Sequence, residues 1–93
     1  MDNSVLENPL TSIVFSFLVG FLNTKGYAPA SKDYVEAGAI SSTSVVDRHL
    51  TILEEAGMIV RTRVRGRQIG RGIKLSEEAK EMLYGDEKEE TES

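Results

Sequence analysis

Residues 43–75 read TSVVDRHLTILEEAGMIVRTRVRGRQIGRGIKL, and the hydrophobic period of this stretch changes at Gly57. Before Gly57, apolar residues recur every three or four positions, as on one side of an α-helix. After it, apolar and polar residues alternate, as in a β-strand with one face in water. Ser41 or Ser42 is suited to cap the helix, and Gly57 to end it. The stretch therefore predicts a helix followed by extended chain.

The extended part reads as a β-hairpin. Val60, Thr62 and Val64 alternate with arginines, so we expect the arginine side of this strand to face water. Residues 65–68 (RGRQ) suit a turn, and residues 69–75 a returning strand with its three aliphatic side chains on one face. The hairpin would thus carry a strongly basic surface.

Two further helices precede this stretch. Asn8 and Pro9 suit the N-cap and first position of a helix over about 9–24, and Gly26 suits its end. Residues 9–22 are very apolar, but no basic residue precedes them and they fall short of the roughly 20 residues of a membrane span. We predict a helix of a soluble domain there. Ser31 would cap a short second helix ending near Gly38.

The chain after the hairpin is acidic. Ser76 is placed to cap a last helix over residues 77–84, with acids in its first turn, and Gly85 to end it. The sequence predicts an N-terminal tail over 1–8, one domain over 9–84 and a disordered acidic tail over 85–93.

Charge is segregated along the chain. The net charge of the 93 residues is -4, yet residues 25–75 carry nine basic and five acidic side chains, whereas residues 76–93 carry two basic and eight acidic ones. Residues 61–74 hold five arginines, one lysine and no acid. There is no cysteine and one histidine, so the composition offers no zinc-thiolate site, cysteine nucleophile or histidine cluster. We predict neither a metal, nor a cofactor, nor an enzyme.

The order of these elements predicts an α+β fold, a winged helix-turn-helix with a three-helix core, a β-hairpin wing and a C-terminal helix. In such a domain the third helix enters the major groove and the wing follows the backbone or minor groove of double-stranded DNA. A basic wing suits phosphates, and binding should then weaken with salt. Edge arginines also block strand pairing, but that role needs only one or two charges.

Three segments resemble the DNA-binding domain of LexA-type repressors: GYAP (26–29), SSTSVVDRHLTILEEAGMI (41–59) and GRGIKL (70–75). HLTILEEAGMI is also similar to MarR and ArsR regulators, and LSEEAKEML to the helix after the wing in MarR relatives. The resemblance covers about residues 10–83 and implies a sequence-specific DNA-binding protein, a transcription repressor of the cytoplasm. The peptidase dyad of LexA and the metal ligands of ArsR are not found here, so self-cleavage and metal sensing are not carried over.

The resemblance implies that Arg48 lies where LexA has an acidic residue near the bases, so the recognised sequence should differ. An arginine there can bind guanine, or else pair with Asp47, Glu55 or Thr51 on the protein surface. We expect Asp47 to orient Arg48. The predicted DNA contacts are Ser42, Thr43, Ser44, Val45, Asp47, Arg48, Thr51, Arg61, Arg63, Arg65, Arg67 and Arg71. His49 is expected to be a hydrogen-bonded core residue instead.

The first helix has a second apolar stripe, formed by Phe15, Val19 and Leu22. We expect it to form a homodimer interface unless the C-terminal helix covers it. A second hypothesis makes the chain a protein-interaction module that binds polymerase or another regulator through this face. RNA binding is disfavoured, because the wing and third helix have no aromatic residues to stack on bases.

Overall fold

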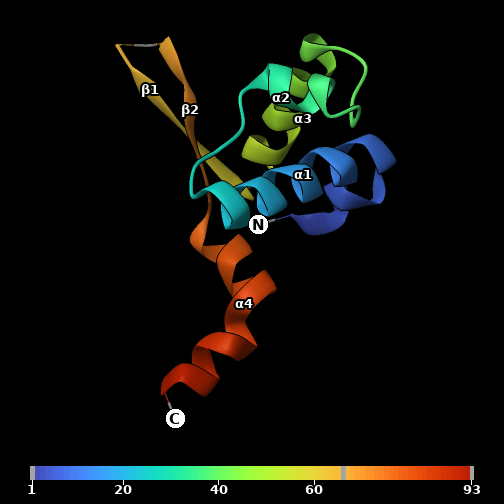
Figure 1. The fold of residues 1–93 in the computed structure, drawn as a ribbon. Helices are drawn as coiled ribbons and strands as arrows, with labels where there is room; N and C mark the ends of the chain where they lie inside the picture. The colour runs from blue at the N-terminus through green and yellow to red at the C-terminus, as the bar shows by residue number, and fades with distance from the viewer. Residues whose placement is uncertain (1, 66, 93) are drawn as a thin grey trace.

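The structure, a computed structural model, describes the backbone of residues 2–65 and 67–92 and the side chains of residues 2–63, 65 and 72–85. Its elements in chain order are η1 (Asn3–Glu7), α1 (Pro9–Lys25), α2 (Ser31–Glu36), α3 (Thr43–Glu55), β1 (Ile59–Val64), β2 (Arg67–Leu75) and α4 (Glu77–Glu92). Helices α1 to α3 form the body (Figure 1), the hairpin rises from one side of it, and α4 leaves at the opposite end. This is the predicted α+β winged helix-turn-helix arrangement.

The helix ends follow the local signals of the sequence. The side chain of Asn8 accepts hydrogen bonds from the amides of Leu10 and Thr11, and Gly26 ends α1 with a φ of 82°. Ser42 caps α3 by accepting from the amide of Val45. Such bonds satisfy amides that the first turn of a helix leaves without partners. These three predictions are confirmed.

The predicted cap of α2 is wrong. Ala30 occupies the N-cap position, and the carboxylate of Asp33 accepts a hydrogen bond from its amide at 2.8 Å. Ser31 lies inside the first turn, and its hydroxyl donates to Asp47 of α3 at 2.6 Å. The hydroxyl therefore joins α2 to α3 instead of capping its own helix.

The core lies between α1 and α3. Four side chains on one side of α1 are buried: Thr11, Val14, Phe15 and Leu18. They pack with the inner side of α3, where Val46, Leu50 and Leu53 are buried as well. The other predicted members of the second stripe, Val19 and Leu22, are half-buried against this core.

Burial of Phe15 corrects the predicted interface. A side chain that is 5% exposed cannot reach a second copy of the chain or another protein. Phe15 is therefore core, whereas Val19 and Leu22 stay half-buried, so an interface on this stripe remains a prediction for those two residues alone. The reason is that Phe15 belongs to the core cluster, against which side chains of η1 and α4 also pack.

The two strands pair antiparallel, with Ile59 opposite Leu75 and Arg61 opposite Ile73. The register then shifts, and pairing resumes with Arg63 opposite Gln68. Ile59, Ile73 and Leu75 are buried, as is Arg61, whereas Val60 is 46% exposed.

At the base of β1 the predicted faces are thus reversed, because Arg61 faces the protein and Val60 faces water, whereas Arg63 and Arg65 are exposed as predicted. Alternation with a period of two defines the two faces of a strand but does not say which of them is buried. The prediction placed the apolar face inside on the basis of residue type alone. Here a carboxylate of α3 compensates the charge of the buried arginine, as described below.

Both chain ends differ from the sequence prediction. Residues 3–7 form the helix η1, and the amide of Asp2 donates to the carbonyl of Ala56 at 2.8 Å, so this segment packs on the domain.

Helix α4 does not end at Gly85, since its backbone stays helical to Glu92 where a disordered tail was expected. Glu and Lys have high helix propensity, and a single internal glycine costs only about 1 kcal/mol. None of the described helices is long and apolar enough to cross a membrane.

Candidate nucleic-acid interface

One side of α3 faces solvent at its N-terminal end. Thr43, Ser44, Asp47 and Arg48 are exposed there, while the opposite side of the helix packs into the core. The short α2 and the turn over residues 37–42 lead into this end of α3, as in a helix-turn-helix. The N-terminal residues of the second helix of that motif are the ones that reach base edges.

Arg48 is the basic side chain of this surface. No hydrogen bond or ion pair joins its guanidinium to another residue whose side chain the structure describes. Of the predicted alternative partners, Asp47 and Thr51 bond to other residues, and Glu55 has no bond to a described side chain. Asp47 accepts from Ser31, so it braces α2 against α3 instead of orienting Arg48 as predicted. The donors of Arg48 are therefore available for an external acceptor such as guanine O6 and N7.

The hydroxyls of α3 are partly engaged. Ser42 caps the helix and lies 3.2 Å from the hydroxyl of Ser44. Thr51, also predicted to contact DNA, donates to the carbonyl of Asp47 and accepts from Arg61. Its hydroxyl is therefore engaged in bonds within the protein. Thr43 and Ser44 remain the exposed polar side chains beside Arg48.

Arg61, which the sequence analysis predicted to contact DNA, bonds within the protein and is nearly buried. Its guanidinium donates from Nε at 3.0 Å and from Nη2 at 2.8 Å to Glu54 Oε1. The whole residue is only 9% exposed. The physical reason is that the last turn of α3 presents a carboxylate to the inner face of β1.

Arg63 has a mixed environment. Its Nη1 donates to Glu54 Oε2 at 3.1 Å and its Nη2 to Oε1 at 3.2 Å, yet its side chain stays 45% exposed. Hydrogen bonds from Arg63, together with those from Arg61, hold the pKa of Glu54 below its ordinary value. The hydrogen bonds between Arg63 and Glu54 raise the pKa of Arg63. Glu54 is the functional candidate that the sequence analysis missed, since nothing in its local pattern distinguishes it from Glu55.

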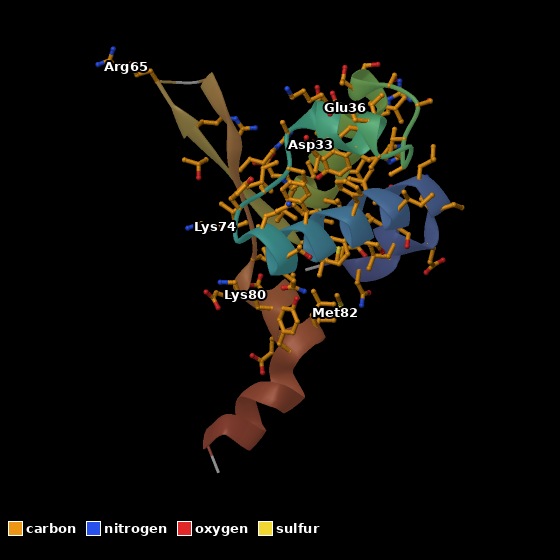
Figure 2. All side chains as sticks on the ribbon, in the orientation of Figure 1. Asp33, Glu36, Arg65, Lys74, Lys80 and Met82 are labelled. Carbon is orange, nitrogen blue, oxygen red and sulfur yellow. The ribbon has the colours of Figure 1, made fainter. Side chains whose placement is uncertain are left out.

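Arg65 lies at the tip of the wing. Its side chain is exposed and points away from the body (Figure 2), and its backbone has a φ of 55°, which non-glycine residues seldom adopt. Lys74 is exposed near the base of the hairpin. The side chains of Arg67 and Arg71, also predicted to bind DNA, lie outside the described residues.

Behind this surface, His49 is buried and shares a hydrogen bond of 2.7 Å with the hydroxyl of Thr11 on α1. Burial, and secondarily the charge of Arg48, lowers the pKa of His49, so the ring is neutral at pH 7. The prediction of a hydrogen-bonded core histidine is confirmed. Its bond fixes the packing of α3 on α1.

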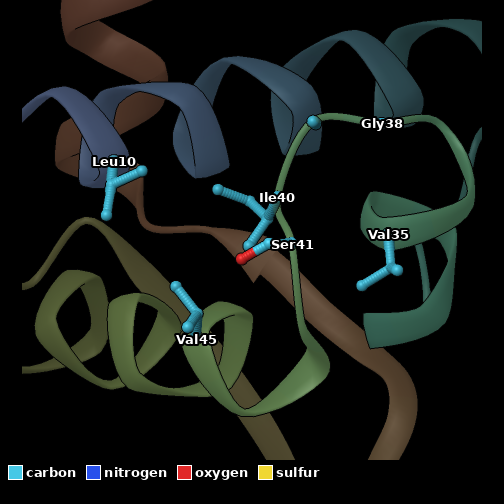
Figure 3. A pocket seen from close by; sticks show the side chains of 7 residues that line it. Leu10, Val35, Gly38, Ile40, Ser41 and Val45 are labelled. Atoms are coloured by element: carbon cyan, nitrogen blue, oxygen red, sulfur yellow. The ribbon is translucent and has the colours of Figure 1, made fainter.

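A hollow of about 540 Å³ lies beside the helix-turn-helix, between α1, the α2–α3 connection and α3 (Figure 3). It is lined by Leu10, Val35, Gly38, Ala39, Ile40, Ser41 and Val45. Val45, predicted to approach bases, is half-buried at this hollow. The lining carries no charged side chain, which does not suit phosphate. Among the described residues, no three His, Cys, Asp or Glu side chains gather as a metal site would require.

Comparison with known proteins gives a consistent result. Residues 9–68 match the family described as the LexA DNA binding domain. The LexA repressor of Clostridium perfringens (strain 13 / Type A) is 38% identical over 72 residues, covering 75% of this chain and 34% of the relative. That of Carboxydothermus hydrogenoformans is 33% identical over 69 residues, covering 74% and 33% respectively. The chain thus spans about a third of the length of the curated relatives it matches. No solved structure matches it significantly.

Proposed function

Because the chain belongs to the LexA DNA-binding domain family, we propose that it binds double-stranded DNA in a sequence-specific manner and acts as a transcription repressor in the cytoplasm. The observation that carries the proposal is the pair of exposed arginines, Arg48 on α3 and Arg65 at the wing tip. Neither has a partner among the side chains that the structure describes.

The two arginines have different roles in this proposal. Arg48 reads bases from the major groove, where a bidentate contact to guanine discriminates by roughly 1–3 kcal/mol. Arg65 contacts phosphate or the minor groove without reading sequence. Arg63, Arg67 and Arg71 are further wing candidates, whereas Arg61 supports the wing from inside.

The test begins with selection of duplexes from a random pool, followed by binding titrations at several salt concentrations. Arg48→Ala should flatten base preference at one position of the selected site. Arg65→Ala should weaken binding to all duplexes and reduce the slope of log K against log salt by about 0.9. Lys80→Ala removes the same charge from α4, at the end of the molecule opposite the wing, and serves as the matched control. Equal behaviour of the three variants would contradict the proposal.

We also propose that the protein binds DNA as a homodimer, since helix-turn-helix proteins read two half-sites through two-fold symmetry. With Phe15 in the core, the exposed apolar side chains Met82 and Leu83 of α4 are the candidates for its interface. Sedimentation equilibrium at micromolar concentration should show a dimer, and Met82→Glu together with Leu83→Glu should shift it to monomer. A monomer in the unmodified protein would refute this part of the proposal.

A further inference from the structure

The last turn of α3 holds the wing through the carboxylate of Glu54. Glu54 accepts from Arg61 through Oε1 and from Arg63 through both oxygens. Thr51, one turn earlier on α3, extends the cluster by accepting from Arg61 Nη2 at 2.9 Å. Two residues of the candidate reading helix thus bind two arginines of the first wing strand.

The position of these arginines along β1 is the informative feature. Arg61 lies before the shift in strand register and Arg63 lies after it. An irregular ladder bends the hairpin and gives less support to the part beyond it. Glu54 bonds to both sides of the irregularity, so it spans the place where pairing alone holds the wing least.

The cluster is also unlike an ordinary surface ion pair. The side chain of Arg61 is 6% exposed and that of Glu54 is 25% exposed, and the bonds are multiple. Exposed single pairs contribute little because water screens them, whereas a network with several directed bonds fixes geometry. Such a network suits the positioning of one element on another.

We propose that Glu54 is a positioning residue that fixes the outer wing on α3, so that Arg48 and Arg65 can contact one duplex at the same time. This inference rests on the proposed function for its consequence. Without the cluster, the wing must be ordered when DNA binds, which lowers the affinity for the correct site. Non-specific duplexes need no fixed geometry. Loss of the Glu54 carboxylate also leaves the positive charge of Arg63 no longer neutralised by that residue, so it can attract phosphate.

The test compares Glu54→Gln with Glu55→Gln. Both remove one negative charge from the end of α3, but Glu55 is exposed and has no bond to another described residue. In the DNA-free protein, residual dipolar couplings measure how the amides of β1 and β2 lie relative to α3. The unmodified protein and Glu55→Gln should fit one common orientation, whereas Glu54→Gln should show reduced couplings beyond Arg61. Unchanged couplings in Glu54→Gln would overturn the proposal.

The second arm measures affinity for the selected duplex and for a scrambled one. Glu54→Gln should lose roughly tenfold in affinity for the selected duplex, the cost of ordering about two side chains on binding, with no loss on the scrambled one. Glu55→Gln should change both affinities by the same factor. An equal ratio of the two affinities in both variants would overturn the proposal, since a purely structural role would not alter that ratio selectively.

Failure of the proposed function has a different signature. The unmodified protein would then prefer no duplex, while the dipolar couplings would still decide whether Glu54 fixes the wing. If Glu54→Gln does not fold, Glu54→Asp keeps the charge on a side chain one methylene shorter. It should change the couplings and the affinity ratio in the same direction, and an unchanged ratio and couplings would count against the proposal.

Discussion

Replacing Tyr34 by phenylalanine should stabilise the protein. Tyr34 is fully buried, and its hydroxyl has no hydrogen-bond partner among the described residues. An unpaired buried hydroxyl costs roughly 1–3 kcal/mol. Phenylalanine keeps the ring, whose centroid lies 4.7 Å from that of Phe17, and leaves a space of only one oxygen atom. We expect the free energy of unfolding to rise by about 1 kcal/mol, or the melting temperature by about 4–8 °C.

Urea unfolding followed by circular dichroism measures this change, and Tyr84→Phe is the matched control. The hydroxyl of Tyr84 accepts from Asn23 Nδ2 at 3.0 Å, so the same deletion should lower stability by about 0.5–1 kcal/mol. Burial, with smaller contributions from Asp33 and Asp47, raises the pKa of Tyr34 above its ordinary 10.0. The stability that this shift contributes is present below pH 10 and is lost as the pH rises above it.

The advantage of Tyr34→Phe over the unmodified protein should therefore widen in alkaline solution. A fall in stability of 1 kcal/mol or more at pH 7 would refute the reasoning, because it would show that the hydroxyl is paired. An advantage that narrows above pH 10 would contradict the burial argument independently.

Three further predictions concern the core and the wing. His49→Asn keeps an amide near the position of Nδ1. Because the pKa of His49 is lowered, the unmodified protein should lose stability as the pH falls below about 6.5. Urea unfolding from pH 5 to 8 should show no such dependence of the unfolding free energy on pH in the variant. Arg65→Asn suits the positive φ and should raise stability by about 0.5 kcal/mol while weakening DNA binding, whereas Arg65→Gln should weaken binding without the gain. Leu53→Ala, at a fully buried position, should lower the free energy of unfolding by about 2–5 kcal/mol, and a loss below 1 kcal/mol would contradict its place in the core.

The parts of the fold that depend on local chemistry could be predicted from the sequence. Asn8, Gly26 and Ser42 mark helix ends in the structure as they do in the sequence, because capping involves residues only a few positions apart. The change of period at Gly57 predicted the hairpin for the same reason. The exposed Arg48 followed from the helical period of α3.

The parts that depend on contacts between distant elements could not be predicted in this way. A helical period cannot tell which apolar stripe other elements will cover, so Phe15 was placed on the surface. The two faces of β1 are equivalent by period, and the carboxylate of Glu54, which lies on another element, helps to make Arg61 acceptable on the inner one. The hydroxyl of Ser31 found a partner on α3 that no local rule names.

The opposite directions of the wing and α4 have a practical consequence for anyone who attaches a reporter to this protein. A fluorophore or affinity tag at the carboxyl end would lie away from the arginine-bearing surface (Figure 1). One attached at the amino end would adjoin Asp2, whose amide bonds to the end of α3, and would disturb the packing of that helix. Fusions for binding assays or single-molecule imaging therefore belong after α4.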